Sequence, residues 1–360
     1  MRLLICPDKF AGTLSAPDAA AAVAEGWRSV RPDDDLVLRP LADGGPGFVD
    51  VLAAAHPEGT HPEGKRFPVP TTDPLGRPVE GEILVVGETA YVESAHACGL
   101  HHLSPAERDP RRASSAGLLA LLTAAAEVDG VRRIVIGLGG SATNDAGVRV
   151  LAGFGHPEAL AAYAGNGSQA GGGTKTLDGI ELIGATDVDN PLIGVRGASR
   201  VFGPQKGADP AAVEELEAAL VRVANVLPEG IAETPGAGAA GGLGAAILAL
   251  GGRLTSGIQL VRDAIGLDVE LQRADLVITG EGSFDEQSLH GKVIDGVAGA
   301  GAALGVPVVV IAGRVTAEPA AWRAAGVTRA WSLSEEFGLE RALGDARGCV
   351  REVAARLAVG

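Results

Sequence analysis

The sequence is short of aromatic residues and of positive charge. Phe, Trp and Tyr make up 3% of its 360 residues, and 45 Asp and Glu against 30 Lys and Arg leave a formal net charge of −15. Duplex DNA is bound by clustered Lys and Arg, and single strands are bound by stacking aromatic rings. The composition therefore argues against a nucleic-acid partner, and it predicts an interior built mainly of Ala, Val, Leu and Ile.

Cysteine and long apolar runs are scarce as well. The three cysteines, Cys6, Cys98 and Cys349, show no CxxC spacing, so we expect them to be reduced, small apolar side chains. The apolar runs fall well short of the ~20 residues that cross a bilayer, and the run at residues 3–6 is too short for the apolar core of a secretory signal. We therefore expect a cytoplasmic protein that does not contact membranes.

Short apolar runs without polar alternation recur along the chain. They are LLIC (3–6), LVL (36–38), ILVV (83–86), RIVIG (133–137), LVITG (276–280) and VPVVVIAG (306–313). Such runs are typical of parallel strands that are buried on both faces. Helical patterns lie between them, and Ser15 and Asp209 are suitable residues to cap two of these helices. Alternating strands and helices predict an α/β fold with largely parallel sheets.

The order of these elements predicts two domains. Both ends of the chain alternate strand and helix, and a segment dense in turn residues, 69–81, separates the first units from the middle. We predict a discontinuous α/β domain of residues 1–66 and 286–360. A second α/β domain, residues 67–285, would be inserted into it and would carry a glycine-rich loop.

That loop is IGLGGSATNDAG, residues 136–147, directly after an apolar run. A glycine-rich turn that opens a helix exposes backbone N–H groups, which favour phosphate. The chain has no GxxxxGK[ST] motif and therefore no P-loop, and its seven histidines have no metal spacing such as HExxH. The loop is either a simple turn or a cradle for an anion.

Two glycine patterns leave a dinucleotide-binding alternative open. Residues 137–142 spell GxGxxA after a predicted strand, with Glu158 about twenty residues on, but Glu158 does not follow a second strand. Residues 236–241 spell GxGxxG, but no predicted strand precedes them. An NAD-dependent oxidoreductase is therefore the weaker hypothesis.

Acidic side chains follow several of the predicted strands, and lysines accompany them. In an open α/β sheet the carboxyl ends of the strands form the binding crevice. Carboxylates and lysines gathered there suit Mg²⁺-assisted phosphoryl transfer. Any single aspartate could instead cap a helix, so it is the set that favours a kinase. Its members are Asp8, Lys9, Asp43, Asp187, Asp189, Lys206, Glu281 and Asp285.

Seven segments in order resemble the glycerate kinase family, which includes the bacterial glycerate 2-kinases. They are PDKFAGTLSA (7–16), PLADGG (40–45), TDPLGRPV (72–79), IGLGGSATND (136–145), DVDNPLIGVRGASRVFGPQKGA (187–208), PGAGAAGGLGAAILALGG (235–252) and DLVITGEGSFDEQSLHGK (275–292). The resemblance covers nearly the whole chain. It implies two α/β domains, one inserted in the other with the active-site cleft between them. It also implies Mg²⁺-dependent transfer of the γ-phosphate of ATP to D-glycerate, giving 2-phosphoglycerate.

The resemblance also implies roles for individual residues. The acidic and lysine set named above would line the cleft, with Lys9 and Lys206 catalytic. Asp187 or Asp189 would accept the substrate proton, and the same two would hold Mg²⁺. The loop would hold phosphate or the glycerate carboxylate through Gly139, Gly140, Ser141, Thr143 and Asn144. Small-molecule substrates are the expected partners, and the oligomeric state stays open.

The chain departs from the family pattern at several motif positions. Ala11 stands where the family has Lys in DKFKG, Pro46 and Phe48 alter ADGGEGT, and Ser283 replaces the Arg of GEGR. A Gly–Glu pair is replaced by Leu119 and Ala120. These changes are compatible with an ordinary glycerate kinase, with a kinase for another small hydroxy acid, or with a non-catalytic nucleotide- or ligand-binding homologue.

Overall fold

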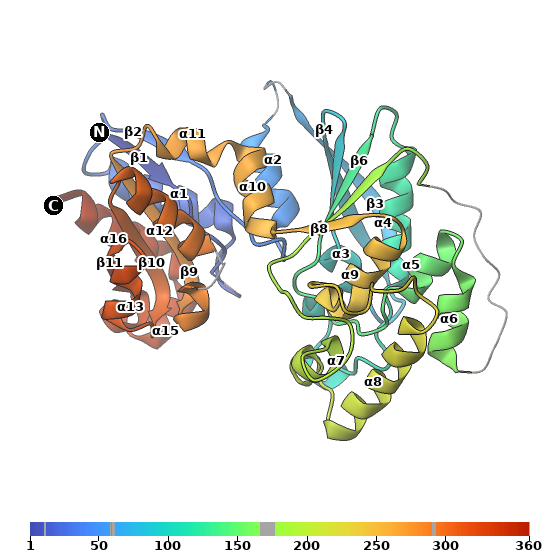
Figure 1. The fold of residues 1–360 in the computed structure, drawn as a ribbon. Helices are drawn as coiled ribbons and strands as arrows, with labels where there is room; N and C mark the ends of the chain where they lie inside the picture. Colours follow the sequence, from blue (N-terminus) through green and yellow to red (C-terminus); the bar gives the residue numbers. More distant parts are fainter. Residues whose placement is uncertain (11, 58, 60–61, 166–176, 290–292, 360) are drawn as a thin grey trace. The chain divides into compact units, whose positions relative to one another are not determined.

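The chain folds into two compact units, each built around one β-sheet (Figure 1). The computed structural model describes residues 1–10, 12–57, 59, 62–165, 177–289 and 293–359. The first unit comprises Met1–Asp43, Asp50–His56 and Ile258–Gly360, and the second comprises Gly44–Val49 and Pro57–Gly257. The predicted α/β class, with one unit inserted in the other, is confirmed.

The first sheet has five parallel strands in the order β11-β10-β9-β1-β2. Four of its strands contain apolar runs that the sequence singled out. The runs of β1, β9 and β10 are largely buried as expected, whereas the run of β2 at the edge of the sheet is only partly buried. The strands are β1 (Arg2–Ile5), β2 (Asp35–Leu38), β9 (Leu276–Phe284), β10 (Val308–Val315) and β11 (Val327–Ser332).

The structure differs from the predicted domain boundary at residue 285. Strand β9 pairs with β1 through Leu3↔Leu276 and with β10 through Val308↔Val277. Residues 258–285, which the prediction assigned to the insert, therefore belong to the first unit. Local apolar patterning finds this strand but does not show which sheet it joins, because strand pairing is a long-range choice.

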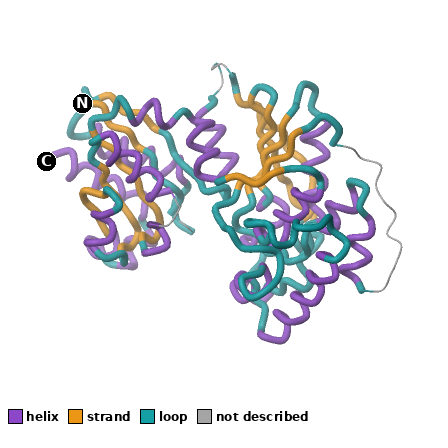
Figure 2. The backbone as a smooth tube through the Cα atoms, viewed as in Figure 1, coloured by secondary structure: helices purple, strands orange, loops and turns teal. Residues whose placement is uncertain are grey.

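Helices surround the strands of the first sheet (Figure 2). Helices α1 and α16 pack together, and Trp27, Val350 and Val353 lie in the core on that side. Helix α2 (Phe48–Ala55) runs from the second unit into the first, and α10 (Gly257–Ile265) begins where the second unit ends. The other helices are α1 (Ala16–Arg28), α11 (Leu267–Leu271), α12 (Val293–Leu304), α13 (Pro319–Ala324), α14 (Leu333–Phe337), α15 (Leu339–Gly344), α16 (Ala346–Val359) and the 3₁₀ turn η4 (Glu286–Leu289).

The second sheet has six strands in the order β3-β4-β5-β6-β7-β8 and is mixed. The pairs β3·β4 and β4·β5 are antiparallel, whereas the remaining pairs are parallel. This sheet is therefore less parallel than predicted, because the turn-rich segment 69–81 closes a hairpin between β3 and β4. The strands are β3 (Gly64–Thr72), β4 (Pro78–Val86), β5 (Thr89–Glu93), β6 (Arg133–Gly137), β7 (Glu181–Ala185) and β8 (Arg253–Thr255).

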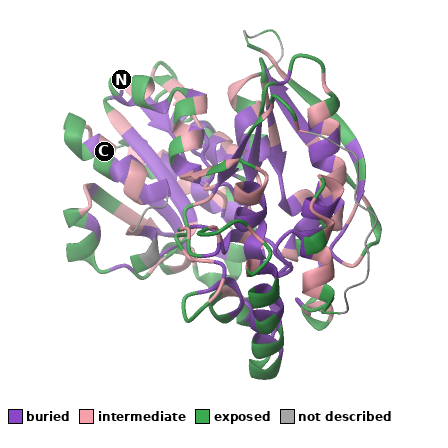
Figure 3. Cartoon of the chain, turned by 45° about the vertical axis from the view of Figure 1, so that its right-hand side comes forward, coloured by how far each residue is buried: buried purple, intermediate pink, exposed green. Residues whose placement is uncertain are grey.

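The central strands β5, β6 and β7 of the second sheet are largely buried (Figure 3), whereas β3 and β8 at its edges are mostly exposed or partly exposed. Helix α4 packs Leu118, Leu121 and Leu122 into the core of this sheet. Asp209 caps α8 as predicted, since its carboxylate accepts from Ala212 N at 2.8 Å. The helices are α3 (Ala95–Cys98), α4 (Ala116–Glu127), α5 (Val148–Gly153), α6 (Pro157–Ala164), α7 (Ala198–Phe202), α8 (Pro210–Ala224) and α9 (Ala239–Ala249), with 3₁₀ turns η1 (Leu100–His102), η2 (Pro105–Glu107) and η3 (Pro204–Lys206).

Two expectations from composition can be compared with the structure. All three cysteines are buried free thiols, as predicted. In the part of the chain that the structure describes, no helix is both long and apolar enough to cross a lipid bilayer.

The contact between α1 and α16 depends on a glycine. A Cβ atom added to Gly26 would lie 2.0 Å from the carbonyl oxygen of Arg351. We expect Gly26→Ala to lower the free energy of unfolding by about 1–3 kcal/mol, since the two helices must separate. Urea denaturation measures this change. The matched control is Gly299→Ala in α12, where nothing lies within 4 Å of the added atom.

Gly299→Ala should raise the free energy of unfolding by about 0.4–1 kcal/mol, because alanine reduces the freedom of the unfolded chain and favours helix. Equal denaturation midpoints for the two variants would show that the close approach at Gly26 does not constrain the helix pair.

Candidate functional site

The glycine-rich loop begins where β6 ends, at the carboxyl end of the second sheet. Leu138 N donates to Ala185 O at 3.1 Å, which continues the ladder between β6 and β7. On its other side, Leu100 N donates to Gly140 O at 2.8 Å, and Ala142 N donates to Cys98 O at 2.7 Å. Backbone bonds on both sides therefore fix the course of the loop.

Close backbone packing requires glycine in and around the loop. Gly140 has a φ of 74°, and a Cβ atom on it would lie 2.7 Å from the Pro46 ring. A Cβ atom on Gly139 would lie 2.4 Å from the Cα of Gly45, and one on Gly241 would lie 1.9 Å from the carbonyl oxygen of Thr143. Without these glycines, the loop could not keep its present path.

The same geometry bears on the dinucleotide alternative. The GxGxxG pattern at residues 236–241 is preceded by turns and not by a strand, and Gly241 packs against the glycine-rich loop. Glu158 lies in α6, so it does not end a second strand. The GxGxxA pattern therefore lacks the acidic residue of a dinucleotide-binding fingerprint, and the GxGxxG pattern lacks the preceding strand.

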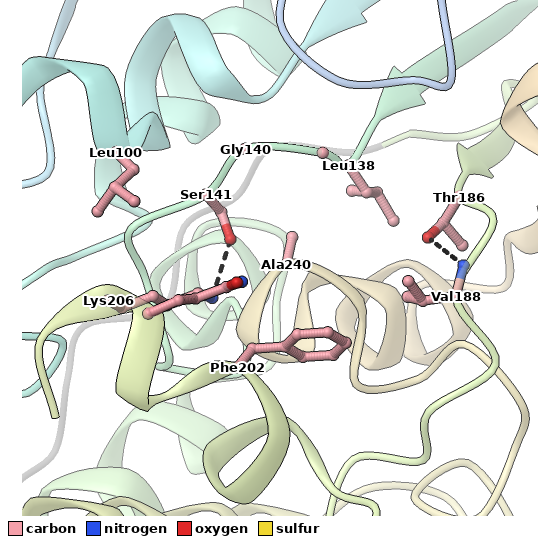
Figure 4. A pocket seen from close by; sticks show the side chains of 11 residues that line it. Leu100, Leu138, Gly140, Ser141, Thr186, Val188, Phe202, Lys206 and Ala240 are labelled. Carbon is pink, nitrogen blue, oxygen red and sulfur yellow. Dashed lines mark hydrogen bonds between the residues drawn. The ribbon is translucent and has the colours of Figure 1, made fainter. Parts of the chain in front are cut away.

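Lys206 lies beneath the loop and is 3% exposed. Its Nζ donates to Ser141 Oγ at 3.1 Å and to Thr143 O at 2.7 Å (Figure 4). Both acceptors are neutral, and Lys206 forms no ion pair with a carboxylate of the described residues. Burial lowers the pKa of Lys206 to about 8, because a low dielectric disfavours the charged form.

Asp145 provides the nearest compensating charge. It is 4% exposed and accepts hydrogen bonds from Ser115 N at 2.8 Å, Ser115 Oγ at 2.9 Å and Gly147 N at 3.1 Å. Burial raises the pKa of Asp145, while these donors oppose the shift. The negative charge of Asp145 in turn raises the pKa of Lys206 against the effect of burial.

Asp145 is absent from the predicted site. The available signal was that it is the one acidic residue in the stretch 136–147. Its burial, which gives that charge its influence on Lys206, depends on α4 and could not be inferred from the stretch itself.

A cavity of about 380 Å³ opens beside the loop and Lys206. One end is formed by the loop backbone and the ammonium group, and the other by apolar side chains (Figure 4). We call it the loop pocket. It is lined by Leu100, Leu138, Gly139, Gly140, Ser141, Thr186, Val188, Phe202, Gln205, Lys206 and Ala240. Cationic and backbone N–H groups at one end suit a phosphate or carboxylate.

The structure separates the predicted loop residues into two groups. Gly139, Gly140 and Ser141 line the loop pocket with Lys206. Thr143 is fully buried, and its backbone carbonyl accepts a hydrogen bond from Lys206 Nζ. Asn144 is also fully buried, and its Nδ2 donates to Ser199 Oγ at 3.0 Å. Thr143 and Asn144 therefore support the loop from behind.

The two predicted metal ligands have other contacts in this structure. Asp187 accepts from Ser256 Oγ at 2.6 Å and from Gly257 N at 3.0 Å, which places it at the start of α10. Asp189 is exposed and pairs with Arg196 at 2.7 Å, and this guanidinium lowers the pKa of Asp189. The described residues contain no group of three or more His, Cys, Asp and Glu arranged to hold a metal. The role of Asp187 and Asp189 as metal ligands stays a prediction.

In the first unit, the structure gathers three of the predicted residues. Lys9 Nζ lies 3.7 Å from Asp8 Oδ1 and 3.6 Å from Asp43 Oδ1. Burial raises the pKa of Asp8 to about 6, and the charge of Lys9 opposes that shift. Asp8 N also donates to Gly280 O at 2.8 Å, which joins this group to β9.

The two remaining predicted residues lie on or just beyond β9. Glu281 does not follow the strand but lies within it, because β9 continues to Phe284 in register with β10. Asp285 follows the strand and accepts from Ser288 N at 3.3 Å, at the start of η4. Their predicted role in binding stays a prediction.

Five residues that depart from the family pattern lie within the described residues, and none of them lines the loop pocket. Pro46 packs on Gly140, and Phe48 is fully buried near Gly137. Leu119 and Ala120 line a separate cavity of about 480 Å³ with Thr71, Thr72 and Thr123. Ala11 lies outside the described residues.

Ser283 has an arginine as its neighbour. Residues in register on adjacent parallel strands point to the same face of a sheet, and Arg314 of β10 is in register with Ser283. Both side chains are exposed. A guanidinium group is therefore present one strand away from the position where the family pattern has arginine.

Comparison with known proteins gives consistent matches. The model of the glycerate kinase family matches residues 3–359. An uncharacterized protein of Mycobacterium tuberculosis (strain CDC 1551 / Oshkosh) is 42% identical over 99% of this chain and 92% of that protein. Glycerate 2-kinase of Escherichia coli (strain K12) is 39% identical over 100% of this chain and 99% of that protein. A crystal structure from Salmonella typhimurium LT2, described as glycerate kinase 2, has a TM-score of 0.79 and 37% identity, covering 100% and 97%.

Anion binding in the loop pocket should depend on the protonation of Lys206. Below a pH of about 8 the ammonium is charged, and above it the charge is lost. We expect the affinity for inorganic tripolyphosphate to be constant from pH 7 and to fall as the pH rises through about 8. Titration calorimetry at several pH values measures this. Lys206→Met should bind weakly and show no such step, whereas a step that persists in this variant would contradict the assignment.

The same titration tests the charge of Asp145. Asp145→Asn removes a negative charge that favours the ammonium, so the midpoint should fall by roughly one pH unit or more. Ser115→Ala removes one hydrogen bond and leaves both charges, so its midpoint should stay near that of the unmodified protein. Equal midpoints for all three proteins would show that Asp145 does not influence Lys206.

Proposed function

We propose, because this chain belongs to the glycerate kinase family, that it transfers the γ-phosphate of ATP to the 2-hydroxyl of D-glycerate. The observation that carries the proposal is the buried Lys206 ammonium, which the glycine-rich loop holds at one end of the loop pocket. Phosphoryl transfer requires positioned cations and N–H donors more than covalent chemistry by the protein. This pocket supplies both.

The group of Asp8, Lys9 and Asp43 supports the proton step. A general base works best when its pKa lies near the operating pH. The pKa of Asp8 is raised to about 6, whereas Asp189 is exposed and has a lowered pKa. We therefore assign to Asp8 the acceptance of the hydroxyl proton, in preference to Asp187 or Asp189. Lys9 would neutralise charge that develops on the substrate.

Magnesium would enter as the ATP complex. Mg²⁺ is usually held by one or two carboxylates together with phosphate oxygens, so no cluster of three carboxylates is needed. When bound, the ion would neutralise charge on the phosphates. In the proposed reaction the protein's own residues bind the anion, orient it and accept the proton.

The retained residues favour catalysis over a purely binding role. Most of the departures lie in the support of the loop or in a separate cavity, whereas the pocket keeps Lys206 and the loop glycines. A kinase for another small hydroxy acid remains the second candidate, because Ser283 alters a position of the family pattern on β9, the strand to which Asp8 N donates a hydrogen bond.

Turnover with separate substrates tests the proposal. With Mg²⁺ and ATP, we expect ADP release on addition of D-glycerate and much less with L-glycerate or other hydroxy acids. Enolase should convert the product, because it takes 2-phosphoglycerate and not the 3-isomer. The control is Lys206→Met, which should lose activity while its circular dichroism spectrum is unchanged. Tight ATP binding without ADP release for any acid would favour the binding-protein alternative.

The register between β9 and β10 gives a second prediction. If Arg314 supplies the cation that Ser283 lacks, Arg314→Ser should lower kcat/KM for D-glycerate by about 10- to 100-fold, as the loss of a charge-assisted hydrogen bond does. The exchange Ser283→Arg with Arg314→Ser should restore much of that loss. Steady-state kinetics measure both variants.

Arg351→Ser is the matched control, since Arg351 is an exposed arginine of the same unit on α16. It should have the kinetics of the unmodified protein. Normal kinetics of Arg314→Ser would show that this arginine does not replace the one in the family pattern.

A further inference from the structure

The loop pocket has an apolar end that D-glycerate cannot use. Leu138, at the start of the loop, forms this end with Val188 and Phe202, on the side of the pocket away from Ser141 and the Lys206 ammonium. D-glycerate carries oxygen on each of its three carbons, so it offers no apolar surface to these side chains. The volume of about 380 Å³ falls within the range of sites for drug-sized ligands and cofactors. The pocket therefore fits a larger ligand with one anionic and one apolar end.

Phe202 is the aromatic side chain of this pocket, in a chain with 3% aromatic residues. It is partly exposed and ends α7, four residues before Lys206 on η3. The turn between them is tight, because a Cβ atom on Gly203 would lie 2.3 Å from Ser199 O. One short segment therefore brings a ring and an ammonium group to the same pocket (Figure 4).

The segment that carries the ring is hydrogen-bonded to the glycine-rich loop. Ser199, in the same helix as Phe202, is fully buried and accepts from Asn144 Nδ2 at 3.0 Å. Lys206, beyond the turn, donates to Ser141 and Thr143. Because the segment is held at both of these points, the spacing between the ring and the loop is fixed before a ligand arrives, which lowers the entropic cost of binding.

We propose that the loop pocket is the nucleotide site, with the phosphates against the loop and Lys206 and the nucleobase stacked on Phe202. This inference rests on the proposed kinase function and deepens it by assigning one substrate to one unit. A purine nucleoside triphosphate has an anionic chain at one end and a planar π-face at the other. Stacking on an aromatic ring is favourable for every base, so the site selects a nucleotide over inorganic polyphosphate.

Binding of the separate parts of the ligand tests the proposal. Calorimetry would compare ATP, inorganic tripolyphosphate and D-glycerate on the full chain. Phe202→Ala should weaken ATP binding by about 5- to 150-fold, the range that loss of one stacked base gives, and leave tripolyphosphate binding unchanged. Phe202→Tyr keeps the ring and should bind ATP normally. In kinetics, Phe202→Ala should raise KM for ATP and leave KM for D-glycerate unchanged.

Phe67→Ala is the matched control, since Phe67 is a 37% exposed phenylalanine of β3 that does not line the pocket. It should bind all three ligands normally. Unchanged ATP affinity of Phe202→Ala, or a loss confined to D-glycerate, would overturn the nucleotide assignment while turnover of D-glycerate left the kinase function standing. Weakened ATP binding in a protein that phosphorylates no acid would support the assignment and remove the kinase function.

Discussion

The burial of the Lys206 ammonium against two neutral oxygens of the glycine-rich loop is the interaction on which the site depends. A buried charge without a paired charge is unfavourable, and here the carboxylate of Asp145 offsets that cost without contacting the ammonium. The cation therefore keeps hydrogen-bonding capacity that is not used by an ion pair. A ligand anion would supply the direct counter-charge, so the folded protein is prepared to bind phosphate before any phosphate is present.

The loop holds this arrangement through backbone packing more than through charged motif residues. At Gly139, Gly140 and Gly241, a neighbouring backbone or ring lies so close that an added Cβ atom would not fit. Pro46 and Phe48 changed the family pattern in the supporting layer, where they pack against Gly140 and Gly137. A change in this layer alters how the loop is held while the groups that face the pocket stay the same, which explains why a divergent motif is compatible with a retained site.

Much of the fold follows from local signals, and the limits of the sequence lie where long-range pairing decides. The buried apolar runs predicted β1, β9 and β10, and Asp209 predicted the start of α8, because strand burial and helix capping are local properties. The unit to which β9 belongs was predicted wrongly, because the apolar run 276–280 does not show which strands will pair with it. The turn-dense segment 69–81 was predicted to separate two parts of the chain, and its turn instead joins the antiparallel strands β3 and β4.

The site shows the same division between local and long-range information. Lys206 and the loop glycines were predicted from their motifs, and the pocket brings them together. Asp145 and Phe202 were not predicted. Asp145 matters because it is buried and its charge acts on Lys206, and Phe202 matters because a turn brings it to the same pocket as Lys206. No sequence pattern indicates either feature. Asp187 accepts from Gly257 N at the start of α10. A carboxylate after a strand has the same local sequence whether it caps a helix or binds a ligand, so its predicted role in binding stays a prediction.

In the proposed function the two units carry opposite electrostatic tasks, and this division has a physical reason. Accepting a hydroxyl proton requires a carboxylate such as Asp8, whose pKa of about 6 depends on burial. Binding phosphate requires a cation such as Lys206, whose charge has no direct carboxylate partner. Lys9, whose Nζ lies 3.7 Å from Asp8 Oδ1, already opposes the rise in the pKa of Asp8 that burial causes. A second ammonium in contact with Asp8 would lower that pKa further, and the second ammonium would itself be paired with a carboxylate. In the proposed reaction, the placement of Asp8 and Lys206 on different sheets therefore lets each keep the state that its step requires.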